Sequence, residues 1–269
     1  MNLLELQGPL AGRADSRLAE VAAELDRQLT LDPDLSFQVA AFAHGRLILD
    51  AWGGPHLNRD SLIVPMSVSK NTIGVSVGLL VERGQLDLDA TVASYWPEFA
   101  QAGKAAVTVR QLLSHQAGLP EASPRLSPDE LDLANDERSW RFGHPGASAT
   151  GSALGIATVL AAAVTGVDGG PALLSEDTVA VIGQQQVRGY DEVLDQHDRA
   201  HGIVFQKPSK QLAWGGPRSF GHDGAYGAVA CVDPDAGVAF GYTVARGPWP
   251  GGGDPRAIRI AREIGEIHW

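Results

Sequence analysis

The sequence predicts an α+β fold, in which helices and strands occupy separate stretches of the chain. Three observations lead to this prediction: a helical stretch at 10–31 precedes a strand pair at 37–52, the middle part at 108–180 is mainly helical, and strand-like segments return from 202 before a final helix. Strands and helices that come in runs, rather than alternating one by one, are typical of this class. The 269 residues suffice for one substantial core, so we expect a single domain over residues 1–269.

The first elements follow from the spacing of apolar residues. Within 10–31 these residues recur every three or four positions, which is the period of an amphipathic helix: Leu18, Val21, Ala22, Leu25 and Leu29. The stretch 37–52 is predicted to form the two strands of a hairpin that turns at His44-Gly45.

A further helix is predicted to begin at Ser67. Apolar residues recur at helical spacing after it and stop at Arg83-Gly84, where the glycine is a common helix terminator. Thr108 and Ser175 belong to the residue types that cap helices, so a helix is expected after each of them. The stretch 151–164 is predicted to be a helix rich in small residues.

The last part of the chain is predicted to form strands and a closing helix. Strand-like patterns are found at 203–205, 211–214, 227–232 and 238–244. Helical spacing resumes over 254–267. The stretch 126–140 is polar and poorly periodic, which favours a loop with a short helix after Ser127-Pro128.

Charge and composition restrict the expected partners and cofactors. A net charge of −11 and a pI near 5.1 disfavour nucleic acid and anionic membranes as partners. The sequence has neither a Cys/His cluster with metal-ligand spacing nor a glycine-rich phosphate loop, so we expect no metal and no cofactor. A small-molecule substrate is the expected partner.

The sequence also bears on location and redox state. The longest apolar run, 156–164, is too short to cross a membrane. The first residues lack a basic region before an apolar core, so we expect no signal peptide and a cytoplasmic location. The single cysteine, Cys231, excludes an internal disulfide, and its apolar neighbours predict a buried side chain rather than a reactive thiol.

The pair Ser67 and Lys70 is the strongest candidate for chemistry. Residues three apart lie on one helix face, so Lys70 is expected one turn from Ser67 and on its side. A serine hydroxyl is a poor nucleophile until a neighbouring base takes its proton, and a lysine held in a partly desolvated pocket can do so. The alternative is a capping serine beside a solvated lysine, because a Ser-x-x-Lys match is short.

The chain resembles the serine β-lactamase and penicillin-binding-protein superfamily, in particular its class C-like esterase branch. The motifs that carry the resemblance come in family order and at family spacing: Ser67-x-x-Lys70, the stretch 85–99, Thr108–Pro120 (TVRQLLSHQAGLP) and His222-Asp223-Gly224. The resemblance covers about 39–246. It implies a three-layer α/β/α fold, with a central antiparallel sheet flanked by helices. It also implies a helical lobe at about 108–180, which is predicted to be shortened here.

The shortened lobe is predicted from a missing motif. Relatives carry Tyr-x-Asn or Tyr-x-Ser in this region, and its tyrosine helps to move the proton of the serine. This chain has no tyrosine between 96 and 189, so the block is predicted to be deleted around Asp132 to Asp136. Such a site would be open, and a bulky substrate, a partner protein or a second subunit of a homodimer would cover it.

Without that tyrosine another group must move the proton. Lys70 alone is one option, because Ser-Lys pairs work as nucleophile and base. Tyr226 and Tyr190 are alternatives, although structural roles fit both better. His115 belongs to a signature that is structural in relatives and is predicted to be a core histidine, whereas His144 stays ambiguous.

The resemblance assigns roles to further residues. Ser67 would be the nucleophile and Lys70 its general base, and the backbone N–H groups of Ser67 and Ala225 would form an oxyanion hole. His222 would line the opposite wall, although a half-exposed strand histidine is nearly as good a reading. Gly224 would allow the substrate to approach the strand.

Three more residues complete the predicted substrate-binding set: Asp223, Trp214 and Tyr226. For Trp214 a core aromatic is the better interpretation.

Two classes of function follow from these predictions. The first is a serine hydrolase or acyltransferase that acts on an ester, thioester or amide of a small molecule or biosynthetic intermediate through an acyl-Ser67 intermediate. Esterase or transesterase activity is favoured over β-lactamase activity, because His-x-Gly resembles the esterase branch. The alternative is a non-hydrolytic biosynthetic enzyme or a ligand-binding protein that lost the chemistry together with the tyrosine.

Overall fold

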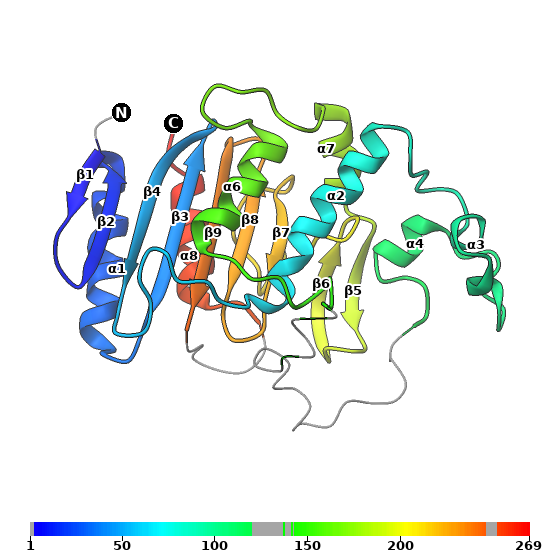
Figure 1. Ribbon diagram of the computed structural model, residues 1–269, viewed down its shortest axis with the longest axis horizontal. Coiled ribbons are helices and arrows are strands. Elements are labelled where there is room, and N and C mark those ends of the chain that lie inside the picture. Colours follow the sequence, from blue (N-terminus) through cyan, green and yellow to red (C-terminus); the bar gives the residue numbers. More distant parts are fainter. Residues whose placement is uncertain (1–2, 120–136, 138–140, 142, 246–251) are drawn as a thin grey trace.

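A seven-stranded sheet forms the centre of the molecule (Figure 1). The computed structural model describes residues 3–119, 137, 141, 143–245 and 252–269. Every neighbouring strand pair in the sheet is antiparallel. In spatial order the strands are β1 (Leu3–Leu6), β2 (Leu10–Asp15), β4 (Arg46–Gly53), β3 (Phe37–Ala43), β9 (Val238–Val244), β8 (Val229–Asp233) and β7 (Phe220–Asp223). A separate hairpin consists of β5 (Val187–Asp191) and β6 (Gln196–His201).

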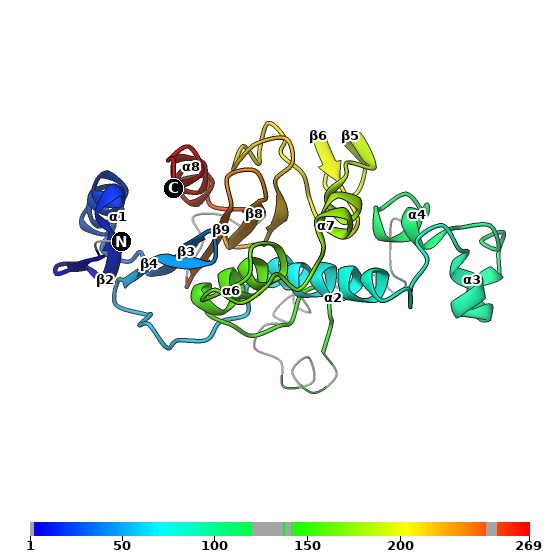
Figure 2. The same cartoon turned by 90° about the horizontal axis from the view of Figure 1, so that it is seen from above.

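Helices cover both faces of this sheet, as Figure 2 shows from above. One face carries α1 (Ala19–Leu31) and α8 (Pro255–Gly265). The other face carries α2 (Lys70–Glu82) and α6 (Ala153–Val164), and α7 (Glu176–Gly183) packs against α2. The short helices α3 (Val92–Tyr95) and α4 (Val109–Leu113) follow α2 in the chain. The three-layer α/β/α prediction is therefore confirmed.

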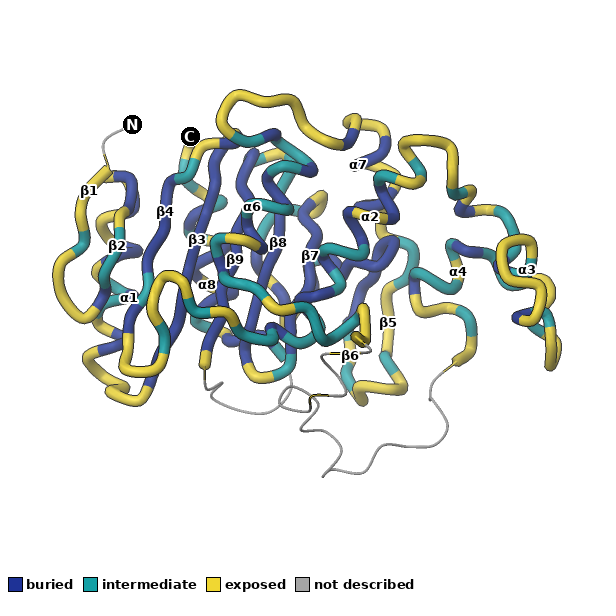
Figure 3. The backbone as a smooth tube through the Cα atoms, in the orientation of Figure 1, coloured by how far each residue is buried: buried dark blue, intermediate teal, exposed yellow. Residues whose placement is uncertain are grey.

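Alternation along the central strands supplies both cores. Successive side chains of a strand point to opposite faces, so a strand covered on both sides is apolar throughout. In β3, Phe37 and Val39 join the core beneath α1 and α8, whereas Ala40 and Phe42 join the core beneath α2 and α6. Figure 3 shows the central strands buried along most of their length.

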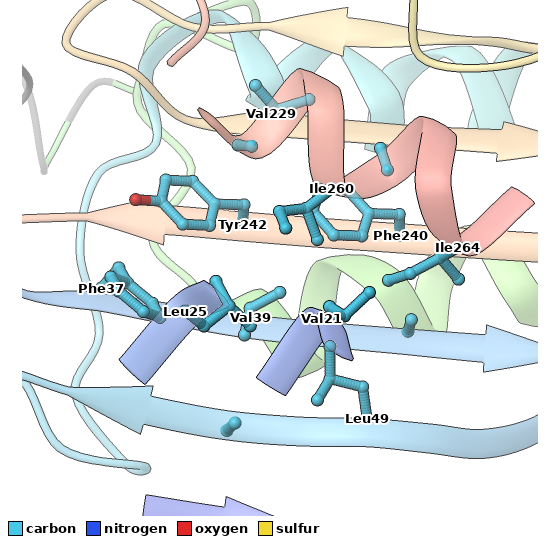
Figure 4. Packing of buried hydrophobic residues seen from close by; sticks show 14 of the residues in the cluster. Val21, Leu25, Phe37, Val39, Leu49, Val229, Phe240, Tyr242, Ile260 and Ile264 are labelled. Carbon is cyan, nitrogen blue, oxygen red and sulfur yellow. The ribbon is translucent and has the colours of Figure 1, made fainter. Parts of the chain in front are cut away.

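The core beneath α1 and α8 is built from interlocking aliphatic and aromatic side chains (Figure 4). Val21 and Leu25 of α1 and Ile260 and Ile264 of α8 pack onto the sheet, where Phe240 is fully buried. Each such residue stabilises the fold by about 1.5–3 kcal/mol relative to an exposed position. This layer fixes the sheet on which the other face builds its site.

The second core depends on close approach of α2 to a buried ring. A Cβ atom on Gly74 of α2 would lie 2.2 Å from Cζ of Phe205, whose side chain is fully buried. Gly74→Ala is therefore expected to destabilise the protein by about 1–3 kcal/mol through overpacking, although alanine normally stabilises a helix interior relative to glycine by about 0.5–1 kcal/mol.

Gly155 in α6 is the matched control for this prediction. A Cβ atom there would meet Ser152 Oγ at 3.5 Å, an ordinary contact. Gly155→Ala is expected to stabilise the protein by about 0.5–1 kcal/mol. Urea unfolding of both variants measures the two effects, and equal stabilisation by Gly74→Ala would contradict the packing described here.

Several predicted elements are confirmed. The hairpin at 37–52 turns at His44-Gly45, the helix after Ser67 ends before Gly84, and Ser175 caps α7. Thr108 caps α4 in a reciprocal capping box with Gln111. Helices at 151–164 and 254–267 and strands at 227–232 and 238–244 are also present, within a few residues.

Other predictions of secondary structure are wrong. The helix predicted from residue 10 begins only at Ser16, because Leu10–Asp15 pairs with β4 as a strand. Leu10 and Ala14 are buried and lie four apart, a spacing that fits both a helix face and every second strand position. The segments 203–205 and 211–214 form bends and irregular loop and not strands, although most of their apolar side chains are buried. The loop and short helix predicted at 126–140 and the deletion point at Asp132 to Asp136 lie outside the described residues, Glu137 apart.

Candidate active site

A tight helical turn presents Ser67 next to the end of β7. The 3-10 helix η2 (Met66–Ser69) precedes α2, and Met66 has a positive φ of 51°. This left-handed conformation is strained for a side chain with a Cβ, and such strain is concentrated at functional sites. Ser69 stabilises the turn, because its hydroxyl donates to Met66 O at 2.6 Å and accepts from Ala149 N at 3.1 Å.

Ser67 and Lys70 are in direct contact. Lys70 Nζ lies 2.9 Å from Ser67 Oγ and donates to Gly146 O at 2.8 Å. Burial lowers the pKa of Lys70, and the Asp223 carboxylate opposes this by raising it. A neutral amine at this position has a lone pair that can accept the Ser67 proton, while an N–H still donates to Gly146. The structure thus places the two residues as nucleophile and base would require.

The end of β7 lies against the turn that carries Ser67. A Cβ atom on Gly224 would lie 2.3 Å from Pro65 O, so only glycine allows this approach. The backbone N–H groups of Ser67 and Ala225 have no hydrogen-bond partner among the described residues. Both donors are therefore available to an oxyanion, and their role as an oxyanion hole stays a prediction.

His222 is buried on the sheet face that carries α2. It pairs in register with Ala230, which belongs to the core on that side. Its Nδ1–H donates to the backbone oxygen of Asp223 at 2.6 Å, which leaves Nε2 as an acceptor in the neutral ring. Burial lowers the pKa of His222 to about 3, against the opposing effect of the Asp223 carboxylate. The half-exposed strand histidine considered above is therefore not what the structure contains.

Asp223 links the end of β7 to neighbouring segments. Its Oδ2 accepts from Gly253 N at 3.0 Å, its Oδ1 lies 3.5 Å from the Arg199 guanidinium, and its backbone N–H donates to Gln206 Oε1 at 3.0 Å. The carboxylate is thus engaged in internal contacts. That Asp223 also binds substrate stays a prediction.

Trp214 and Tyr226 occupy very different environments. Trp214 is only 2% exposed and packs in the core beneath α1 and α8, on the other side of the sheet from η2. Its assignment to the substrate site is wrong, and the alternative of a core aromatic is confirmed. Tyr226 is 45% exposed at the β7–β8 turn, two residues beyond Gly224, with a φ of 69°.

The other three tyrosines have partners elsewhere. Tyr190 donates its hydroxyl to Asp195, Tyr95 accepts from the Asp87 backbone, and Tyr242 is buried and donates to Asp254. The hydroxyl of Tyr190 is thus engaged with Asp195 and not with Ser67.

His115 lies beside a second histidine, His201, that the sequence analysis did not single out. The rings of His115 and His201 lie 4.8 Å apart, and neither ring nitrogen of the buried His201 has a hydrogen-bond partner among the described residues. His115 is exposed and has a φ of 61°, so the prediction of a core histidine there is wrong. Since β6 itself was not predicted, no local pattern indicated that His201 would be buried.

His201 makes stability depend on pH. Burial, reinforced by His115 and Arg199, lowers its pKa to about 4. The folded protein therefore keeps this ring neutral while the unfolded chain binds a proton below about pH 6.5, so stability falls as the pH drops from 6.5 to 4. The loss from this group is up to about 1.4 kcal/mol per pH unit within that window.

His201→Phe is expected to weaken this dependence. Unfolding free energies from urea titrations at pH 5 and pH 7 should differ less in the variant than in the wild type. His56→Gln, at an exposed histidine, serves as the control and should leave the difference unchanged. A variant with the wild-type difference would show that His201 is not a buried neutral histidine.

Two cavities lie away from Ser67. One of about 300 Å³ is lined by Arg17, His44 and Trp269, and another of about 470 Å³ is lined by Val179, Lys207 and Arg218, among other residues. Neither is lined by a residue of the Ser67 site. Within the described segments, no group of three or more His, Cys, Asp or Glu side chains is arranged to hold a metal ion, and no helix is long and apolar enough to cross a membrane.

Comparisons with known proteins identify the family and relatives of this chain. A family model described as Beta-lactamase matches residues 33–172 and 132–263. The esterase/beta-lactamase LipL of Mycobacterium tuberculosis is 32% identical over 182 residues, and esterase EstB of Burkholderia gladioli is 34% identical over 116 residues. These alignments cover 60% and 38% of this chain, but only 42% and 30% of the two relatives.

Solved structures extend the likeness to nearly the whole chain. EstA from Arthrobacter nitroguajacolicus Rue61a has a TM-score of 0.86 and 27% identity, covering 98% of this chain and 99% of its own. A family VIII carboxylesterase has a TM-score of 0.85 at 23% identity, covering 95% and 98%. With a family model matching most of its length, the chain belongs to the Beta-lactamase family.

Proposed function

We propose that this protein is a serine hydrolase that cleaves carboxylic esters of small molecules through an acyl-Ser67 intermediate. The observation that carries the proposal is the 2.9 Å contact between Lys70 Nζ and Ser67 Oγ, with an amine whose pKa is lowered by burial. Such a contact is what a nucleophile and its base need. The esterase names of relatives that share part of their length with this chain support the choice of an ester.

The first half-reaction follows from these contacts. Neutral Lys70 takes the Ser67 proton as Oγ attacks the ester carbonyl carbon, and the N–H groups of Ser67 and Ala225 stabilise the resulting oxyanion. The C–O bond to the alcohol then breaks, and the alcohol leaves with a proton. Water adds to the acyl-enzyme in the second half-reaction, which releases the acid and returns the proton to Ser67. An alcohol, thiol or amine in place of water would make the same site an acyltransferase.

A second candidate function is ligand binding without hydrolysis. It is favoured by the engagement of three of the four tyrosine hydroxyls in contacts away from Ser67. Under this alternative Ser67 and Lys70 would hold a ligand but would not exchange an acyl group.

Hydrolysis of p-nitrophenyl acetate, butyrate and octanoate distinguishes the two candidates. We expect turnover by the wild type that is lost in Ser67→Ala. Ser76→Ala is the matched control, because Ser76 is an exposed serine of α2 whose hydroxyl donates to Thr72 O within the same helix. Activity that persists in folded Ser67→Ala would contradict the proposed nucleophile, and a wild type without turnover would favour ligand binding.

A further inference from the structure

We propose that His144 is the second proton-transfer residue of this site. Through bridging water it would protonate the departing alcohol and, in the reverse direction, take the proton of the attacking water, while Lys70 accepts the proton of Ser67. The inference rests on the proposed acyl transfer at Ser67. It assigns a role to a residue that the sequence left ambiguous.

The turn that carries His144 lies directly on Lys70. A Cβ atom on Gly146 would lie 3.4 Å from Lys70 Nζ and 3.4 Å from Cε1 of His144, so these two atoms are at most twice that distance apart. Cε1 stands between the two ring nitrogens. A chain of at most two waters, with hydrogen bonds of about 2.8 Å each, spans a gap of this size. The histidine ring is thus within two waters of the amine that contacts Ser67.

Hydrogen bonds fix the backbone of His144. The Ser148 hydroxyl bonds to both the N–H and the carbonyl oxygen of His144, and the backbone N–H groups of Ala147 and Ser148 donate to that oxygen at 2.8 and 2.9 Å. Pro145 occupies the second position of this turn, where its fixed φ is favourable. The position from which the ring extends is therefore well defined.

The same turn is tied to the segment that carries Ser67. Gly146 O accepts from Lys70, and Ala149 N donates to Ser69 Oγ at 3.1 Å. Ile63 and Gly151 exchange two backbone hydrogen bonds of 3.2 and 3.0 Å. The distance between His144 and Ser67 is thus set by contacts on both sides of the turn.

The other nearby histidines are poor proton donors. His222 uses its Nδ1–H for the Asp223 backbone, and burial lowers the pKa values of His222 to about 3 and of His201 to about 4. His144 is exposed, so its ring is in contact with bulk water. A proton donor matters most in ester cleavage when the alcohol is a poor leaving group.

Leaving-group dependence tests the proposal. p-Nitrophenolate departs without a proton, whereas butoxide does not. For His144→Gln we expect kcat/KM on butyl acetate to fall by about 100-fold. With p-nitrophenyl acetate the pre-steady-state burst should keep its rate within about threefold, and acetyl-enzyme should accumulate because His144 no longer assists the attacking water. His56→Gln is the control and should behave as the wild type with both esters.

The outcomes separate this inference from the proposed function. Two results for His144→Gln would overturn the role of His144: hydrolysis of butyl acetate at the wild-type rate, or a loss of the p-nitrophenyl acetate burst as large as the loss of butyl acetate turnover. Either result would leave the proposed acyl-Ser67 intermediate standing. A wild type that forms no acetyl-Ser67 would overturn the proposed function and this inference with it.

Discussion

Replacement of Lys70 by methionine is expected to lower kcat/KM for p-nitrophenyl acetate by about 10³-fold, the scale of losing a positioned general base. Lys70 is the one described side chain within hydrogen-bond distance of Ser67 Oγ. In the variant no neighbouring side chain can therefore accept the Ser67 proton in its place. Methionine fills a similar volume without burying an unpaired charge, and the fold should persist.

The pH profile and a matched variant make this prediction specific. Wild-type activity should rise with pH as the Lys70 ammonium loses its proton, at a pH below the usual range for lysine because burial lowers its pKa. This rise of activity with pH should be absent in Lys70→Met. Lys210→Met, at an exposed lysine, should leave rate and profile unchanged. A Lys70→Met protein with activity within about threefold of the wild type would exclude Lys70 as the base.

Gly224→Ala is expected to reduce kcat for the same ester by about 100-fold, which is the effect of losing one oxyanion donor. The new Cβ would meet Pro65 O at 2.3 Å, and neither backbone can yield without separating β7 from η2. Ala225, whose N–H is the second predicted donor, directly follows in the chain. The displacement therefore acts on the geometry of the oxyanion hole and not on Ser67 itself.

Gly189→Ala in β5 is the control for this variant. A Cβ atom there would meet no atom within 4 Å, so both stability and kcat should stay as in the wild type. Thermal unfolding establishes whether Gly224→Ala is folded, and kcat and KM are then measured separately. A folded Gly224→Ala with unchanged kcat would show that the contact between β7 and η2 does not serve the reaction.

Local patterns in the sequence predicted those parts of the fold that depend on local interactions. Helix caps at Thr108 and Ser175 and the alternation of β9 are short-range features, and the structure contains them. β2 is different, because its pairing with β4 joins residues 35 to 43 positions apart and overrides a helix-like spacing of Leu10 and Ala14. The separate hairpin of β5 and β6 has no apolar alternation to indicate it.

The features of the candidate site likewise fall into those that local sequence patterns predicted and those that depend on tertiary contacts. The Ser67–Lys70 contact follows from helical spacing, and the close approach of Gly224 follows from a motif with a physical reason for glycine. The tertiary structure decides on which face of the sheet Trp214 packs. It also decides which neighbours contact the Asp223 carboxylate. Gly146 meets Lys70 across 76 positions of the chain, so no local pattern indicated its carbonyl, or His144 beside it, as part of the site.

Intact-protein mass after incubation with a fluorophosphonate tests the central claim most directly, because this reagent reacts with serine hydroxyls that a neighbouring base activates. We expect one adduct on the wild type, localised to Ser67 by peptide mapping, no adduct on Ser67→Ala and strongly slowed labelling of Lys70→Met. A folded wild-type protein that remains unlabelled, or a Ser67→Ala protein that is labelled as fast as the wild type, would contradict an activated nucleophile at Ser67.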